Sequence, residues 1–107
     1  MTEIKLSFSP LMAQRSLINY KVLTTRLSPK GAPGDTFTLS QNGLTRKFRI
    51  LEIAHLPLFL IAERLFMLEG FETTGDFIDY WDQLPGYPKY KEAYRSYFPA
   101  HFFTSIQ

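Results

Sequence analysis

The stretch Lys21-Val-Leu-Thr-Thr-Arg26, followed after a short interval by Gly34-Asp35, decides how this chain is interpreted. It places an ammonium group, hydroxyl groups and a guanidinium group within six residues, after an amphipathic segment and before a turn into a new strand. Because charged groups are costly to desolvate without partners, such a cluster beside apolar sequence predicts either a polar cleft or a well-solvated edge.

The segments before this stretch show a strand pattern and then a helix pattern. Residues 4–8 alternate apolar and polar side chains, which predicts a strand. Ser9 and Pro10 have the chemistry of a helix start, so an amphipathic helix is expected from Pro10 to about Asn19, a residue that tolerates a left-handed terminus. Residues 21–27 are rich in β-branched side chains and should be extended.

The middle of the chain predicts a hairpin. Residues 36–40 and 44–54 have strand patterns, and Asn42-Gly43 between them suits the positive φ angles of a tight turn. The second half of the longer strand is apolar at successive positions, so both of its faces are expected to be covered.

The remaining chain predicts helices and a closing strand. An apolar helix is expected over residues 57–68, stopped by Gly70, and Thr73 with Asp76 resembles the capping box of a helix over 75–84. A short helical or irregular segment over 90–97 and a strand over 98–106 should follow. The order predicts an α+β fold: a small mixed β-barrel or curled sheet plugged by helices.

Composition restricts the classes of protein. A chain of 107 residues, 45% apolar and with ten Phe, six Tyr and one Trp, predicts a single packed domain over residues 1–107. No cysteine is present, so disulfides and thiolate chemistry are excluded and a cytoplasmic location is expected. No signal peptide is visible, and the longest apolar run, residues 56–62, is too short to span a membrane. His55 and His101 lack ligand spacing, so neither a metal nor another cofactor is expected.

The charge is distributed unevenly along the chain. Residues 1–50 carry eight Lys or Arg against two acidic residues, and residues 51–107 carry four against eight. The basic half includes Lys21, Arg26, Lys30, Arg46, Lys47 and Arg49. Such a distribution favours either a face that attracts anions, nucleic acid among them, or an ordinary solvated surface.

Taken in order, the sequence resembles the ASCH domain of the PUA-like superfamily over essentially its whole length. The matching residues are Ile4, Leu6, Phe8, Met12, Leu17-Ile18, Lys21, Thr24, Arg26, Gly34-Asp35, Phe37, Glu69-Gly70-Phe71, Phe77 and Trp81. The resemblance implies a PUA-like β-barrel flanked by helices that recognises RNA or a nucleoside. One ASCH subfamily of similar size removes acyl groups from the exocyclic amine of cytidine, and its catalytic lysine, threonine and glutamate correspond to Lys21, Thr24 and Glu69.

The three candidate catalytic residues also have ordinary interpretations. Thr24 and Arg26 share a face of a strand, whereas Lys21 joins them only if the chain there is irregular or bulged. Thr24 alone suits any strand, and Lys21 suits a surface position at a helix C-terminus. Glu69, expected in the last turn of the apolar helix, opposes the helix dipole, as a general acid could, unless it is an exposed end with a cationic neighbour.

Substrate-binding candidates complete the hypothesis. Arg26 could bind a phosphate or a base carbonyl, or brace Glu69 or Asp35. Tyr20 and Arg49 are further candidates, with an exposed aromatic wall expected from Tyr20, Tyr87, Tyr90, Tyr94 and Tyr97, and with Phe77 and Trp81 expected in the core. The first hypothesis is a metal-independent acylcytidine amidohydrolase. The alternatives are a non-catalytic module that binds single-stranded RNA and, less favoured, a ribonuclease.

Overall fold

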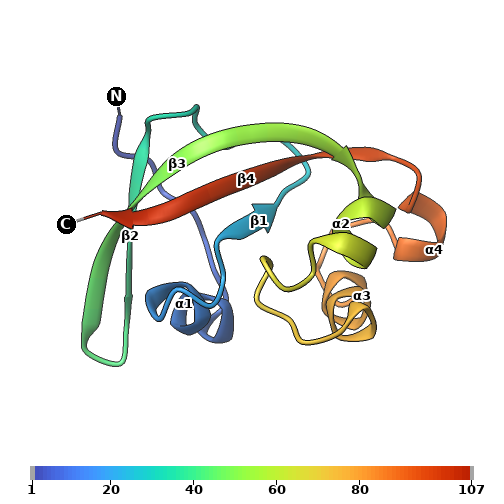
Figure 1. Cartoon of the computed structure of the whole chain (residues 1–107), viewed down its shortest axis with the longest axis horizontal. Helices are drawn as coiled ribbons and strands as arrows, with labels where there is room; N and C mark the ends of the chain where they lie inside the picture. Colours follow the sequence, from blue (N-terminus) through green and yellow to red (C-terminus); the bar gives the residue numbers. More distant parts are fainter. Residues whose placement is uncertain (1, 107) are drawn as a thin grey trace.

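A curled antiparallel sheet forms the framework of the protein (Figure 1). The computed structural model describes residues 2–106. Its four strands lie in the order β1-β4-β3-β2, and the two long strands, β3 and β4, arch over the helices as a half-barrel. The strands are β1 (Leu23–Thr25), β2 (Thr36–Gln41), β3 (Leu44–Pro57) and β4 (Tyr97–Ile106).

Four helices accompany the sheet, and three of them fill its concave side (Figure 1). They are α1 (Pro10–Leu17), α2 (Leu58–Arg64), α3 (Thr74–Asp82) and α4 (Tyr90–Ala93). The fourth, α4, lies at the far end of the arch, where it leads into β4. The predicted α+β class, with a curled sheet plugged by helices, is therefore confirmed.

Side-chain capping and backbone preferences of single residues fix several ends of helices and strands, as predicted. The Ser9 hydroxyl accepts the Met12 amide at the start of α1, and Asn19 beyond its end has a φ of 63°. Asn42 and Gly43 have φ angles of 54° and 79°, which turn β2 into β3.

The predicted strand over residues 4–8 is wrong. Only an isolated parallel bridge between Glu3 and Thr36 forms, with the Ile4 amide donating to the Thr36 carbonyl at 2.7 Å. The alternation instead reflects burial, because Leu6 is 8% exposed and packs in the core while its neighbours Lys5 and Ser7 are exposed. A period of two can thus select buried side chains without a ladder of backbone hydrogen bonds.

The expected covering of β3 on both faces is also wrong. The pairing register with β4 shifts between Ile50 and Glu52, and Leu51 at that bulge is 57% exposed. All of α1–α3 lie on one side of the sheet, so nothing in Figure 1 covers the outer face there.

Two hydrophobic clusters hold the helices against the sheet. In the first, Trp81 and Phe77 of α3 pack with Ile61 of α2, which confirms their expected place in the core. In the second, Phe37, Phe48 and Phe103 join three strands, with ring centroids 5.3–5.6 Å apart. Full burial of such side chains stabilises the fold by about 1.5–3 kcal/mol each. No helix within residues 2–106 has the length and apolar character needed to cross a membrane.

Candidate functional site

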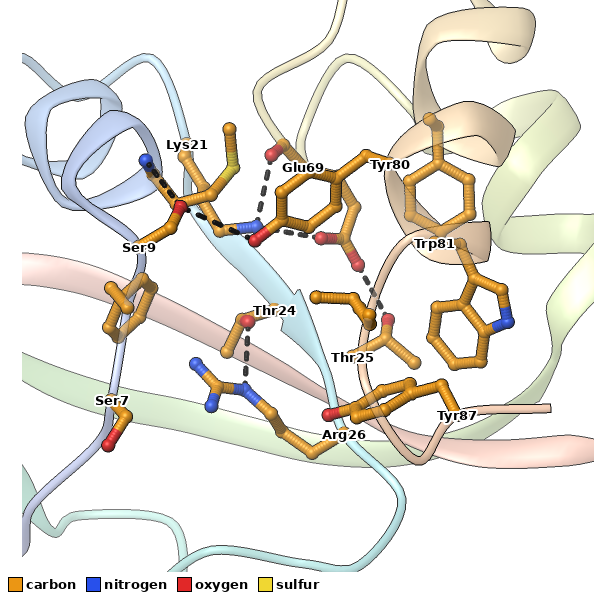
Figure 2. Close-up of a pocket in the computed structure, with 14 residues that line it drawn as sticks. Ser7, Ser9, Lys21, Thr24, Thr25, Arg26, Glu69, Tyr80, Trp81 and Tyr87 are labelled. Carbon is orange, nitrogen blue, oxygen red and sulfur yellow. Dashed lines mark hydrogen bonds and ion pairs between the residues drawn. The ribbon is translucent and has the colours of Figure 1, made fainter. Parts of the chain in front are cut away.

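A pocket of about 290 Å³ opens between the start of α1, strand β1 and helix α3 (Figure 2). Its polar side comes from the stretch around β1 and from Glu69, and its aromatic side comes mainly from α3 and the chain after it. The volume is near the lower end of the range for small-ligand pockets, about 300–1,000 Å³.

Lys21 and Glu69 form a buried ion pair in this pocket. Lys21 Nζ donates to Glu69 Oε1 at 2.7 Å and to the carbonyl oxygens of Leu23 at 2.8 Å and Glu69 at 3.0 Å. The two residues are only 3% and 4% exposed. Burial lowers the pKa of Lys21, and the neighbouring carboxylate of Glu69 opposes that effect. The pair therefore places a perturbed basic group at a pocket wall.

The backbone before β1 brings Lys21 into the pocket. Asn19 reverses the chain, and the amides of Tyr20 and Lys21 both donate to the Arg15 carbonyl at the end of α1. Lys21 and Val22 lie outside β1, so this segment is irregular, which is the condition under which Lys21 was expected to join Thr24.

Glu69 reaches the pocket from a turn rather than from a helix end. Helix α2 ends at Arg64, and the chain continues through successive turns to Gly70, whose φ is 95°. The expected helix over residues 57–68 is therefore too long, and the expected opposition between Glu69 and a helix dipole does not apply. The cationic partner of Glu69 is Lys21, not Arg26.

Thr24 and Arg26 share a face, as their spacing on the strand predicts. Arg26 Nε donates to Thr24 Oγ1 at 3.1 Å, and the guanidinium carbon lies 4.9 Å from the ring centroid of Phe8. Burial lowers the pKa of Arg26, although an arginine keeps its charge at neutral pH. Arg26 thus presents a positive charge beside the Thr24 hydroxyl.

Thr25 is a site residue that the sequence did not indicate. Its hydroxyl donates to Glu69 Oε2 at 2.6 Å, and the residue is 6% exposed. Adjacent strand residues normally face opposite sides, so strand alternation does not predict Thr24 and Thr25 in the same pocket. Both residues line it here, one beside Arg26 and one beside Glu69 (Figure 2).

Aromatic side chains form the opposite wall. Tyr80, Trp81 and Tyr87 line the pocket together with Phe8 and Phe77. Tyr87 belongs to the predicted aromatic wall, and burial raises the pKa of its hydroxyl. Tyr80 was missed; its position on the same side of α3 as Phe77, three residues apart, is the signal that could have found it.

The other predicted binding residues lie elsewhere. Tyr20 is 49% exposed and does not line the pocket, and neither do Tyr90, Tyr94 and Tyr97. Arg49 is on β3 between the buried residues Phe48 and Ile50, so it faces the outer side of the sheet. Its Nε atom has no hydrogen-bond partner among the described residues. The structure therefore brings neither Tyr20 nor Arg49 to the pocket.

His101 lies behind the threonine strand. Its Nε2 accepts the Lys30 amide at 2.9 Å, so its Nδ1 carries the proton and donates to the Thr24 carbonyl at 3.1 Å. Burial lowers the pKa of His101, which favours this neutral form. Within residues 2–106 no three His, Asp or Glu side chains gather closely enough to hold a metal ion.

The curled sheet plugged by helices, with a polar pocket beside its short edge strand, is also found in solved structures. An ASCH domain from Lactobacillus crispatus JV V101 superposes with a TM-score of 0.64 at 9% identity, covering 97% of this chain and 78% of that one. Hypothetical protein PH0355 gives a TM-score of 0.62 at 15% identity, covering 98% of both chains.

A third solved structure, protein EF3133 from Enterococcus faecalis V583, has a TM-score of 0.62 at 12% identity and covers 98% of this chain and 78% of that one. No family model matches the sequence, and no curated protein matches it. At such low identities the likeness establishes the fold alone: this chain has the fold of an ASCH domain.

Proposed function

We propose that the pocket binds a cytidine-type nucleoside and hydrolyses an acyl group from its exocyclic amine. The buried Lys21–Glu69 pair carries this proposal, because it lines the same pocket as the Thr24 hydroxyl, together with an aromatic wall. A buried ion pair often stabilises a protein less than apolar packing of the same volume, so its presence in a cleft favours a functional role. A threonine hydroxyl also needs an adjacent base to act as a nucleophile.

Each residue of the pocket has a separate role in the proposed reaction. Lys21, in its neutral form, takes a proton from Thr24 or from a water that Thr24 holds. Arg26, which donates a hydrogen bond to the Thr24 hydroxyl oxygen, stabilises the oxyanion formed from the amide carbonyl. Glu69 completes the unit as the buried ion-pair partner that holds Lys21 in the pocket. Tyr80 and Tyr87 offer rings for stacking on the base.

A second candidate is a non-catalytic module that binds single-stranded RNA. The observation that favours it is the aromatic wall beside Arg26, since stacking rings and a cation suit a base and its backbone whether or not a reaction follows. Binding of this kind should weaken as salt rises, because it releases counterions from the phosphates. A flat salt dependence would exclude it. A ribonuclease remains the least favoured candidate.

Chromatography of N4-acetylcytidine after incubation with the protein tests the first proposal. Wild-type protein should release cytidine, and Lys21→Met, Thr24→Val and Glu69→Gln should each lose most of the activity, because groups that act as one unit are not additive. Tyr97→Leu, an exposed residue outside the pocket, is the control and should keep full activity. Acetylcytidine that stays intact through long incubation at high protein concentration would contradict the proposal.

A further inference from the structure

Both oxygens of the Glu69 carboxylate are already engaged within the protein. Oε1 accepts from Lys21 Nζ at 2.7 Å, and Oε2 accepts from Thr25 Oγ1 at 2.6 Å. These are short, charge-assisted hydrogen bonds between side chains that are almost fully buried. Glu69 therefore accepts one hydrogen bond at each oxygen of its carboxylate, one from each side of the pocket wall.

Lys21 is ordered by the same contacts. An ammonium group has three N–H donors, and here they are directed to Glu69 Oε1, the Glu69 carbonyl and the Leu23 carbonyl. Rotation of the Glu69 side chain would remove the only one of these acceptors that carries a charge. The Thr25 hydroxyl prevents that rotation by holding the far oxygen of the carboxylate.

We propose that Thr25 is a positioning residue of this site: its hydroxyl holds Glu69 in the orientation that orders Lys21. This inference rests on the proposed function. The Thr24 oxygen bonds to the acyl carbon, and the hydroxyl proton passes to Lys21. The bond from that carbon to the cytidine amine then breaks as Lys21 returns the proton to the nitrogen. Water next hydrolyses the Thr24 ester, its proton passing through Lys21 to the Thr24 oxygen.

The charged groups around Lys21 decide whether loss of the Thr25 hydroxyl raises or lowers the pKa of Lys21. Burial lowers the pKa of Lys21, Arg26 and Arg15 lower it further, and Glu69 raises it. Tyr80 and Tyr87, from α3 and the chain after it, and His101, on β4, are the remaining titratable groups around Arg26 and Glu69. By holding Glu69 against Lys21, Thr25 keeps in place the one group that favours the Lys21 ammonium. Removing the Thr25 hydroxyl lets Glu69 turn away and therefore lowers the pKa of Lys21 further.

Thr25→Val removes the hydroxyl while keeping the shape of the side chain, and Thr25→Ser keeps the hydroxyl. In Thr25→Val, kcat should fall about tenfold with KM nearly unchanged, as expected for the loss of one hydrogen bond to a charged group. Because neutral Lys21 is the active form, kcat/KM rises with pH, and this rising limb should move to lower pH in Thr25→Val, where Glu69 no longer holds the Lys21 ammonium. Thr25→Ser should restore both properties, and Thr104→Val, the same change on an exposed part of β4, should alter neither.

A measurement on wild-type protein without substrate is independent of activity and of whether Thr25→Val folds. Proton NMR should show the Thr25 hydroxyl proton exchanging with water at least about tenfold more slowly than that of exposed Thr104, because it is buried and bonded to a carboxylate. Equal exchange of the two hydroxyl protons overturns the inference. So does an active wild type with unchanged kcat and pH profile in Thr25→Val. An inactive wild type with a protected Thr25 hydroxyl contradicts the proposed function and supports the positioning of Glu69.

Discussion

Arg15 Nη1 donates to the carbonyl oxygen of Gly70 at 2.7 Å, joining α1 to the turn that carries Glu69, 55 residues away. The Arg15 guanidinium also lies 5.4 Å from the ring centroid of Phe71. The backbone carbonyl of Arg15 accepts the amides of Tyr20 and Lys21. One residue therefore connects both halves of the buried ion pair, Lys21 through its backbone and Glu69 through its neighbour Gly70.

Arg15→Gln should destabilise the protein by roughly 1–2 kcal/mol, because a charge-assisted hydrogen bond and a cation–π contact are lost together. Urea denaturation measures the change. The matched control is Arg64→Gln, since Arg64 is exposed and should change the free energy of unfolding by less than about 0.5 kcal/mol. Equal effects of the two substitutions would show that the bond to Gly70 contributes nothing.

Gly70→Ala should be more destabilising than Gly86→Ala. Both glycines have positive φ angles, 95° and 79°, so each substitution strains the backbone by roughly 1 kcal/mol or more. A Cβ on Gly70 would also lie 3.1 Å from Lys21 Cβ, whereas one on Gly86 meets nothing within 4 Å. The difference in melting temperature between the two variants measures the cost of the contact between the new Cβ and Lys21. Equal melting temperatures would mean that Lys21 moves aside freely.

Removing one member of the ion pair should destabilise the protein more than removing both. Glu69→Gln or Lys21→Met leaves a buried group without its partner, which costs about 3–5 kcal/mol. The double substitution Lys21→Met/Glu69→Gln should cost less than either single one, as a double-mutant cycle would measure. Stabilisation by Glu69→Gln, which a carboxylate set against a helix dipole would favour, is not expected because Glu69 is paired and lies beyond α2.

Acid should weaken the fold through His101. Its pKa is lowered in the folded state, so the unfolded chain binds the proton more tightly. The resulting stability is fully present above the usual value of 6.5 and is lost as the pH falls toward the lowered folded value. Wild type should therefore show a steeper loss of stability below pH 6.5 than His101→Gln, in denaturation at several pH values. His55→Gln, at an exposed position, controls for the loss of a histidine as such. If the free energy of unfolding falls in parallel with pH in wild type and His101→Gln, the lowered pKa of His101 does not contribute to acid sensitivity.

Tyr87→Leu should weaken binding of cytidine by about 1–3 kcal/mol, the range found when one base loses an aromatic stacking partner. Calorimetry gives this change directly. Tyr97→Leu provides the comparison, because Tyr97 is 66% exposed and lies outside the pocket. If the two variants bind cytidine equally, the aromatic wall is not a stacking surface for the base.

The features that could be predicted from the sequence are those with local physical causes. Ser9 begins a helix through its own side chain, and Asn42-Gly43 turns a hairpin through its own backbone preference. Thr24 and Arg26 share a face because side chains on a strand alternate. Each of these depends on a few neighbouring residues, which the sequence displays directly.

The features that could not be predicted depend on contacts between distant segments. Thr25 belongs to the site only because Glu69 arrives from 44 residues away. Arg49 alternates on its strand with the buried Phe48 and Ile50, but which face of the strand becomes the interior depends on where α1–α3 pack. Tyr20, one residue from Lys21, faces away because the irregular segment that turns Lys21 inward leaves its neighbour exposed.

The sheet order has a consequence for how the protein is made. Within residues 2–106, strand β1 pairs only with β4, through Leu23 with Phe102 and Thr25 with Ala100, and β4 is the last of the four strands along the chain. On the ribosome, Thr24 and Thr25 therefore wait without a sheet partner until more than 70 further residues have emerged, counted from β1 to the His101 and Phe102 partners. The residues of helices α1–α3 all emerge before β4, so the sheet pairing of the strand that carries Thr24 and Thr25 comes last. A nascent chain stalled before Tyr97 would lack the site.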